Sequence, residues 1–249
     1  MMTAPALDPF GPVAEGYATY RPRYPRAVFH YLAAVAPATR LAIDVAAGSG
    51  QATLGLAAHF RRVLALDVSA RQLAAMPDTD GHVHRAVARA ELLPCTPHGA
   101  DLVLAAQAFH WFEPDAFFTE ASRALRPQGI LALLSYDLSV IAPEIDRAIR
   151  RFHDVAVGED WPIDRASVLG GYAAARLPGR ALAQAQFVIE ATLGVEAYLG
   201  YLATWSAVTR QRARTGVDPL DAFGAELRAA WGDAPRRVRW PLRLRASRV

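Results

Sequence analysis

The chain has 249 residues, of which 53% are hydrophobic and 20% are charged, and its formal net charge is +3. This composition is typical of a globular protein with a sizeable core, and it excludes a disordered chain. No apolar run approaches membrane-spanning length, and the first residues lack the regions of a secretion signal, so we expect a soluble, cytoplasmic protein. The lone cysteine, Cys95, excludes an internal disulfide and gives no metal-ligand spacing, so we expect a packed thiol and no metal site.

The excess positive charge lies near the C-terminus. Residues 208–249 hold 10 arginines against 4 acidic residues. A basic stripe can be a nucleic-acid footprint, but charged and apolar residues alternate strictly along 237–240 and 242–245, which predicts a half-buried strand over 236–246 with one solvated face. Pro241 inside that strand indicates a bulge or an edge position. We therefore expect neither a nucleic-acid nor a membrane partner.

Predicted strands and helices alternate through the first half of the chain. A helix over 26–36 is followed by a βαβα rhythm, which predicts a Rossmann-like, doubly wound α/β fold with a mostly parallel sheet and helices on both faces. A turn at 126–129 precedes the fifth strand. The predicted strands are 41–46, 62–67, 82–87, 101–106 and 129–136, and the helices between them are 50–58, 69–76 and 113–125.

The rhythm loosens beyond about residue 158. The next predicted element is a helix over 143–157. Two further strands, over 185–191 and 236–246, complete a seven-stranded sheet. We expect a helical lid that includes helices over 195–207 and 219–231. We find no internal repeat or linker and expect a single domain. Its parts are an N-terminal lid segment (1–36), a cofactor-binding core (37–157), a lid and substrate elaboration (158–235) and the final strand (236–249).

The most informative motif is the stretch 41–53, where an apolar run ends in Asp44 and a turn with Gly48 and Gly50 follows. Asp67 closes the next apolar run, near the separation at which such folds place a carboxylate on a ribose. The arrangement predicts a nucleotide-like ligand at the carboxyl ends of neighbouring strands. A dinucleotide is disfavoured because Thr53 stands where that fingerprint needs a small residue and because Asp44 is not part of it.

The combination of Asp44, Gly48, Gly50 and Asp67 resembles the class I S-adenosylmethionine-dependent methyltransferases. The resemblance implies that the first acid lies by the methionine amino group, that the second binds the ribose hydroxyls, and that the glycines admit the cofactor. The segment 90–94 resembles the part of this family that follows the third strand. The segments 17–25, 106–112, 204–206 and 240–242 resemble a small-molecule subgroup that includes trans-aconitate methyltransferase-like enzymes. The implied cofactor-binding residues are Asp44, Ala46, Gly48, Gly50, Asp67, Val68, Ala90, Glu91, Gln107 and Ala108.

Ala46 departs from the family pattern, which has glycine at alternating positions. A Cβ disfavours positive φ, so a positive φ at this position would weaken cofactor affinity. We expect the φ of Ala46 to be negative, since Gly48 and Gly50 remain.

Several of these residues have ordinary structural alternatives. Asp44 and Asp67 could each cap the helix that follows, although Ser69 could take that role from Asp67. Glu91 could be a solvated surface acid.

His110 follows the fourth strand at the rim where ligands bind, and it could be a general base, a substrate or cofactor contact, or a structural residue. Arg21 and its neighbouring tyrosines could form a lid over the ligand, and an arginine fork suits a substrate carboxylate. The alternative is a segment held in place by its own aromatic and proline residues. The candidate substrate residues are Tyr17, Tyr20, Arg21, Tyr24, His110, Trp111, Tyr136 and Trp205.

The resemblance implies methyl transfer from S-adenosylmethionine to a small acceptor, with an oxygen of a carboxylate or a hydroxyl as the expected target. His110 is the candidate base for a hydroxyl. Two alternatives stay open: a non-catalytic cofactor-binding protein, and a nicotinamide-dependent oxidoreductase. The acceptor's identity and the choice between monomer and homodimer are not predicted.

Overall fold

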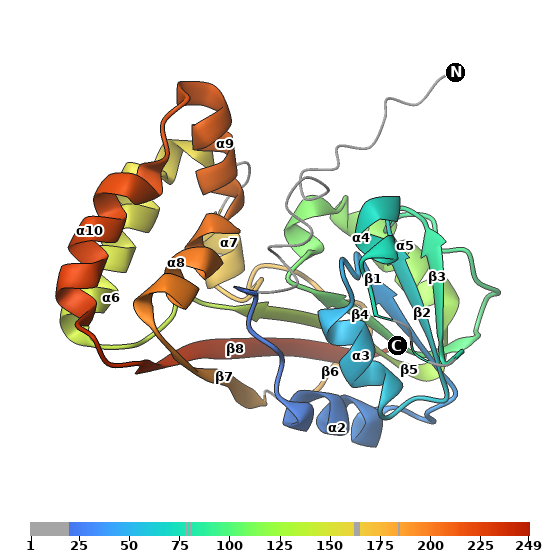
Figure 1. Ribbon diagram of the computed structural model, residues 1–249. Coiled ribbons are helices and arrows are strands. Elements are labelled where there is room, and N and C mark those ends of the chain that lie inside the picture. Colours follow the sequence, from blue (N-terminus) through green and yellow to red (C-terminus); the bar gives the residue numbers. More distant parts are fainter. Residues whose placement is uncertain (1–19, 78, 80, 162–164, 184) are drawn as a thin grey trace.

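The computed structural model describes residues 20–77, 79, 81–161, 165–183 and 185–249, which form an eight-stranded sheet flanked by helices (Figure 1). The strand order is β3-β2-β1-β4-β5-β8-β6, and β7 also pairs with β8. Strands β1 to β5 are parallel, whereas β8 runs antiparallel to β5, β6 and β7. The strands are β1 (Leu41–Val45), β2 (Arg62–Asp67), β3 (Val83–Val87), β4 (Ala100–Ala106), β5 (Leu125–Tyr136), β6 (Arg180–Ala181), β7 (Gln186–Leu193) and β8 (Arg236–Arg248).

The predicted Rossmann-like α/β fold is confirmed, and the sheet has one strand more than the seven expected. The extra strand, β6, is two residues long and too short to leave a hydrophobic pattern. The described helices are α2 (Arg26–Val35), α3 (Gln51–Ala57), α4 (Ala70–Ala74), η2 (Phe109–Trp111), α5 (Pro114–Ala124), α6 (Pro143–Arg151), η3 (Phe152–Ala156), η4 (Gly158–Asp160), α7 (Arg165–Leu169), α8 (Val195–Ala203), α9 (Ser206–Thr215) and α10 (Pro219–Trp231).

The central strands β1 and β4 are buried almost throughout, because helices cover both faces of the sheet. On one face, Phe29 of α2 and Leu56 of α3 pack in a cluster with Leu104 of β4. On the other face, Phe117 of α5 packs with Val103 of the same strand. The carboxyl ends of β1, β2 and β4 therefore meet at one edge of the sheet, where doubly wound folds bind their ligands.

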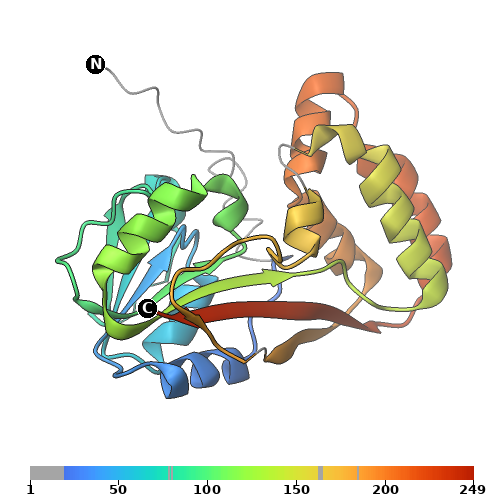
Figure 2. The same ribbon diagram turned by 180° about the vertical axis from the view of Figure 1, so that it is seen from behind.

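A second group of helices, α6, α8, α9 and α10, stands beyond this edge and is seen from behind in Figure 2. The 13-residue strand β8 runs beneath both the sheet core and these helices (Figure 1). Trp231 of α10 and Trp240 of β8 belong to the same buried cluster as Leu104, so the apolar core is continuous between the two parts. Among the described residues, no helix has the length and apolarity to cross a membrane.

Two predicted helices are interrupted. The helix predicted over 143–157 is α-helical only to Arg151 and continues as a π-helical turn, η3. The helix predicted over 195–207 breaks between α8 and α9, where Trp205 adopts an extended backbone and the Thr204 hydroxyl donates to the carbonyl of Tyr201 at 2.6 Å.

The structure differs from two predictions about irregular strand positions. The turn predicted at 126–129 is instead an irregular stretch inside β5, where the pairing to β4 shifts register and Gln128 has φ +68°. Pro241 is not at an edge, since β8 has neighbours on both sides. It lies where the regular pairing with β5 ends at Tyr136, so its missing N–H interrupts no regular ladder.

Candidate functional site

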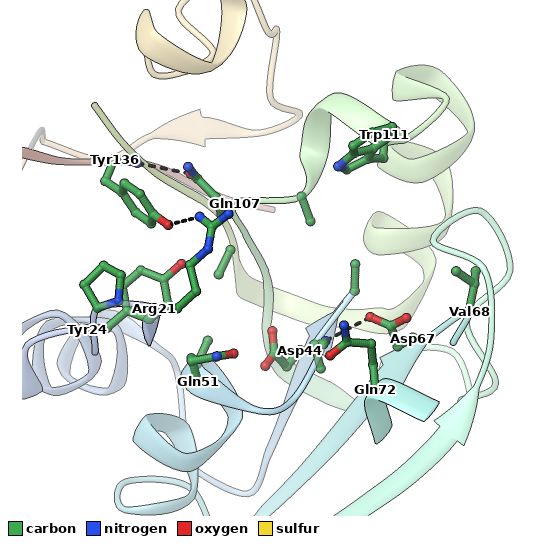
Figure 3. Close-up of a pocket in the computed structure, with 17 residues that line it drawn as sticks. Arg21, Tyr24, Asp44, Gln51, Asp67, Val68, Gln72, Gln107, Trp111 and Tyr136 are labelled. Atoms are coloured by element: carbon green, nitrogen blue, oxygen red, sulfur yellow. Dashed lines mark hydrogen bonds between the residues drawn. The ribbon is translucent and has the colours of Figure 1, made fainter. Parts of the chain in front are cut away.

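A pocket lies at the carboxyl ends of β1, β2 and β4 (Figure 3). Its empty volume, open mouth included, is about 810 Å³, which falls in the usual range for ligand clefts. In this view Asp44, Asp67 and Gln72 lie along one wall, with Arg21, Gln107 and Tyr136 facing them. The lining residues are Arg21, Pro22, Tyr24, Asp44, Ala46, Ala47, Gly48, Gln51, Ala52, Asp67, Val68, Gln72, Ala106, Gln107, Ala108, Trp111 and Tyr136.

Asp44 is fully buried at the end of β1. The Thr53 hydroxyl in α3 donates to its Oδ2 at 2.6 Å, whereas its Oδ1 has no hydrogen-bond partner within the described part of the chain. Burial raises the pKa of Asp44 to about 7, the Thr53 hydrogen bond opposes this rise, and Asp67 adds to it. Asp44 is not a helix cap, because Gly50 occupies that position. The residue is therefore a buried acceptor with one oxygen still to be satisfied.

Asp67, at the end of β2, ties the glycine turn to the next loop. Its Oδ2 accepts from the Gly48 amide at 2.9 Å and its Oδ1 accepts from the Ser69 amide at 2.8 Å. Ser69 caps α4 by accepting from the Gln72 amide at 3.3 Å, so the alternative role of Asp67 as that cap is wrong.

The predicted negative φ of Ala46 is wrong, since its φ is +57°. Ala46 therefore occupies the left-handed region, where an alanine is strained and a glycine is not. Gly48 also has a positive φ, +56°, and a Cβ added to it would lie 3.8 Å from its nearest neighbour, Gln72 Oε1, so this glycine leaves open space on the pocket side. The turn keeps its shape despite the alanine, at the expense of backbone strain in Ala46.

Gln107 and Ala108 follow β4 and line the pocket. The Gln107 backbone has φ +55°, and its side-chain Oε1 accepts from the Tyr136 amide at 3.1 Å. This hydrogen bond joins the end of β4 to the end of β5.

The described part of the N-terminal segment covers one side of the pocket. Arg21 donates from Nη1 to the Tyr136 hydroxyl at 2.5 Å and from Nη2 to the Thr204 carbonyl at 3.1 Å. Tyr24 lines the pocket beside Arg21, whereas Tyr20 packs on Gly200 of α8. The predicted substrate residue Tyr17 lies outside the described residues.

A second pocket adjoins the first and shares Arg21, Gln107, Trp111 and Tyr136 with it. It lies between the sheet edge and the helices beyond, and its empty volume is about 530 Å³, smaller than that of the first. Trp205, one of the predicted substrate residues, lines this second pocket. The residues that it adds are His110, Asp137, Leu138, Trp161, Arg165, Tyr201, Trp205 and Ser206.

His110 belongs to the short helix η2 and lines the second pocket. Its Nδ1 lies 2.8 Å from the Tyr172 hydroxyl. Burial first, and then the positive charge of Arg165, lower the pKa of His110 to about 3. The imidazole is therefore neutral at pH 7 and is a weak proton acceptor.

Three of the ten residues expected to bind cofactor do not line the first pocket. Gly50 is the N-cap of α3 with φ +93°, and a Cβ there would lie 2.6 Å from Met76 Cγ, so both the turn and the packing favour a glycine. Ala90 is buried, and the Glu91 side chain accepts from the Glu113 amide and pairs with Arg89.

Sequence reasoning missed several residues of the site. Gln51 and Gln72 line the first pocket, and Thr53 holds Asp44. Arg165 and Trp161 line the second pocket but come from the segment without clear periodicity. Within the described ranges, no group of three or more His, Cys, Asp or Glu side chains could hold a metal ion.

Comparison with known proteins agrees with this geometry. Residues 43–133 match the family described as "Methyltransferase domain". A solved structure from Anaeromyxobacter dehalogenans, described as a type II methyltransferase, is 44% identical with a TM-score of 0.83 and covers 92% of this chain and 98% of its own. A Dictyostelium discoideum protein named as a methyltransferase is 29% identical over 80% of this chain and 77% of its own length. An uncharacterized methyltransferase of Mycobacterium tuberculosis is 34% identical over 50% of this chain and 51% of its own.

The chain therefore belongs to the class I S-adenosylmethionine-dependent methyltransferases. It is an enzyme of methyl transfer, and its methyl donor is S-adenosylmethionine. The first pocket suits that molecule, because the unsatisfied Asp44 Oδ1 matches an ammonium group and Gly48 leaves room for close approach. Membership of the trans-aconitate-like subgroup stays a prediction.

Proposed function

We propose that this enzyme transfers a methyl group from S-adenosylmethionine to an oxygen of a small-molecule acceptor, either a carboxylate or a hydroxyl. The observation that carries the proposal is the pair of adjoining pockets with four shared lining residues. The first pocket has acidic and glycine groups suited to the donor, and the second is smaller and walled by aromatic side chains. An acceptor bound in the second pocket would therefore lie next to a donor bound in the first.

We assign the donor's groups to the first pocket. The Asp44 carboxylate binds the methionine ammonium, which favours the ionised acid and satisfies Oδ1. Asp67 binds the ribose hydroxyls, because a carboxylate can accept further hydrogen bonds besides those from the Gly48 and Ser69 amides. Val68, Gln107 and Ala108 complete the walls around the nucleoside.

When bound, the donor supplies an electrophilic methyl group on a sulfonium. The protein's work is then to align the acceptor with that methyl group and to exclude water. Arg21 donates to both Tyr136 and Thr204 and lines both pockets, so its guanidinium is held where the donor and acceptor sites adjoin. We propose that residues 20–25 and the described parts of 160–210 form a lid over the acceptor, within one domain. Residues 10–19, 162–164 and 184, which we also assign to the lid, lie outside the described residues.

The pKa of His110 favours a carboxylate acceptor. A hydroxyl acceptor needs a base, and a histidine with a pKa of about 3 is poorly matched to that task at neutral pH. A carboxylate is already ionised and needs none. We therefore place His110 as a contact on the acceptor's pocket, held by Tyr172.

The experiment is a screen of small carboxylic acids and phenols with S-adenosylmethionine, in which product masses are read directly. We expect at least one small acceptor to gain the mass of one methyl group, and we expect carboxylic acids to be methylated in preference to phenols. Methylation of added protein or nucleic acid in place of every small acceptor would contradict it.

A further inference from the structure

We propose that the second pocket is an anion site, in which Arg165 binds the carboxylate of a small acceptor that has an aromatic or apolar body. This inference rests on the proposed function, because it names the acceptor class of the same site. The residue lies on α7, within the segment assigned from the sequence to the lid and substrate elaboration, but it is not among the residues predicted there to contact substrate.

Arg165 is held in the pocket without a carboxylate partner among the described residues. Its guanidinium carbon lies 4.4 Å from the centre of the Trp161 ring, a cation–π contact. Its Nε is buried and has no hydrogen-bond partner in the described part of the protein. A guanidinium has five N–H donors in a planar fork that matches a carboxylate, so these donors are available to a ligand.

The charges around Arg165 favour an incoming anion. Burial lowers the pKa of Arg165; Tyr201 opposes this shift, and the positive charge of Arg21 adds to it. His110 is neutral at pH 7 and supplies no negative charge. Asp137, the acid that lines this pocket, is engaged by Arg243 at 2.7 Å. Among the described residues, none supplies a counter-charge to this half-buried guanidinium. A cation left in that position is costly, and a bound carboxylate would relieve the cost.

The fold fixes the orientation of this cation. The π-helical turn η3 leaves the His153 carbonyl to accept from Trp161 Nε1 at 3.1 Å. Trp161 also packs on His153 and on Trp205, with ring centres 4.9 Å and 5.5 Å apart. Trp161 is therefore a rigid platform for Arg165, and π-helical turns are frequent at functional sites.

The walls define the rest of the acceptor. Trp161, Tyr201 and Trp205 line the pocket, and Trp111 and Tyr136 border it on the side of the first pocket. Aromatic walls of this kind suit a small planar or apolar body. Arg21 is less suited to select the anion, because Tyr136 and Thr204 already accept from it and because it also lines the donor pocket.

The test is calorimetric titration of the protein saturated with S-adenosylhomocysteine. The probes are matched pairs of an acid and its primary amide: benzoate and benzamide, phenylacetate and phenylacetamide, hexanoate and hexanamide. The variants are Arg165→Gln, Arg165→Lys and, as a control, Arg147→Gln. Arg147 is exposed on α6 and makes no ion pair among the described residues.

At least one acid should bind, and its amide should bind at least roughly tenfold more weakly. Arg165→Gln should weaken binding of the acid by roughly 10- to 100-fold and leave binding of the amide unchanged. Arg165→Lys should bind the acid more tightly than Arg165→Gln does, and Arg147→Gln should bind it as the wild type does. S-adenosylhomocysteine affinity and the unfolding midpoint should be unaffected by Arg165→Gln, which separates lost recognition from lost folding.

The inference is overturned if amides bind as well as acids, if Arg165→Gln binds the acid normally, or if no acid binds to protein that does bind S-adenosylhomocysteine. In each case the proposed function survives. If S-adenosylhomocysteine does not bind, the same titrations are made on the ligand-free protein. If acids still bind and Arg165→Gln weakens that binding, the anion site is supported although the proposed function is refuted.

Discussion

At the scale of single residues, Asp44 carries the strongest physical signal in the molecule. Its carboxyl is fully buried, is bonded on one oxygen by Thr53, and has a pKa raised to about 7. A buried carboxylate with an unsatisfied oxygen destabilises the protein on its own. A ligand ammonium bonded to the free oxygen would remove this destabilisation. The burial of Asp44 is therefore consistent with a role in binding.

Asp44→Asn should change how stability depends on pH. In the wild type the pKa of Asp44 is near 3.8 unfolded and about 7 folded, so the contribution of this one group to stability is greatest at low pH, falls as pH rises between these values, and is constant above about 7. The fall is at most about 4 kcal/mol. The variant loses this contribution, so its stability relative to wild type should increase from pH 5 to pH 8 in urea unfolding. Parallel curves for the variant and the wild type would contradict the account, and exposed Asp233→Asn is the control.

Ala46→Gly should stabilise the protein, because it removes the left-handed strain at φ +57°. The gain should be about 0.5–1 kcal/mol, since glycine's greater freedom in the unfolded chain offsets part of the relief. Ala47→Gly is the matched control: Ala47 is buried and is not among the residues with positive φ, so it should destabilise by about 0.5–1 kcal/mol. Equal losses in both variants, measured by urea unfolding, would show that Ala46 is unstrained.

At the scale of elements, the segment from η3 to α7 builds the acceptor side. η4 is tied to α9 by Asp160, which is buried and accepts from Arg214 Nε at 2.9 Å and Nη2 at 2.7 Å. Trp161 follows directly, so this ion pair holds the start of the platform under Arg165.

Asp160→Asn should lower the free energy of unfolding by about 1–3 kcal/mol, because it breaks a charge-assisted, two-point contact at a buried oxygen. The hydrogen bond from Arg214 lowers the pKa of Asp160, so this contribution is present above the acid's ordinary pKa and is lost as pH falls below it. Glu226→Gln breaks an exposed pair with Arg151 and should cost less than about 1 kcal/mol. Equal losses for the two variants would contradict the structural role given to Asp160.

At the scale of the whole molecule, the sheet core was predictable and the acceptor side only in part: the sequence predicted His110 and Trp205 as substrate residues, and both line the second pocket, but it did not predict Arg165. Continuous apolar runs ending in Asp44 and Asp67 specified parallel strands and the ligand edge. The irregular segment 158–181 has no period, so the position of Arg165 depends on tertiary contacts with Trp161 and on the π-helical turn.

Some local details also lay beyond the sequence pattern. Apolar periodicity continues through Thr204 and Trp205, so the break between α8 and α9 was not visible. The positive φ of Ala46 is set by the geometry of the turn, against the residue's own preference. The Thr53 hydroxyl was noted only as a mismatch to a dinucleotide motif, although its bond to Asp44 was the informative contact.

The assignment of the first pocket to the methyl donor is the central claim. The most direct measurement is calorimetric titration with S-adenosylhomocysteine of the wild type, Asp67→Ala and Asp233→Ala, with unfolding midpoints checked alongside. We expect the wild type to bind with a dissociation constant well below millimolar and the exposed control, Asp233→Ala, to bind equally well. Asp67→Ala should bind at least roughly tenfold more weakly, because it loses charge-assisted hydrogen bonds to the ribose. No heat with the wild type would refute the donor pocket, and unchanged affinity in Asp67→Ala would refute the ribose assignment.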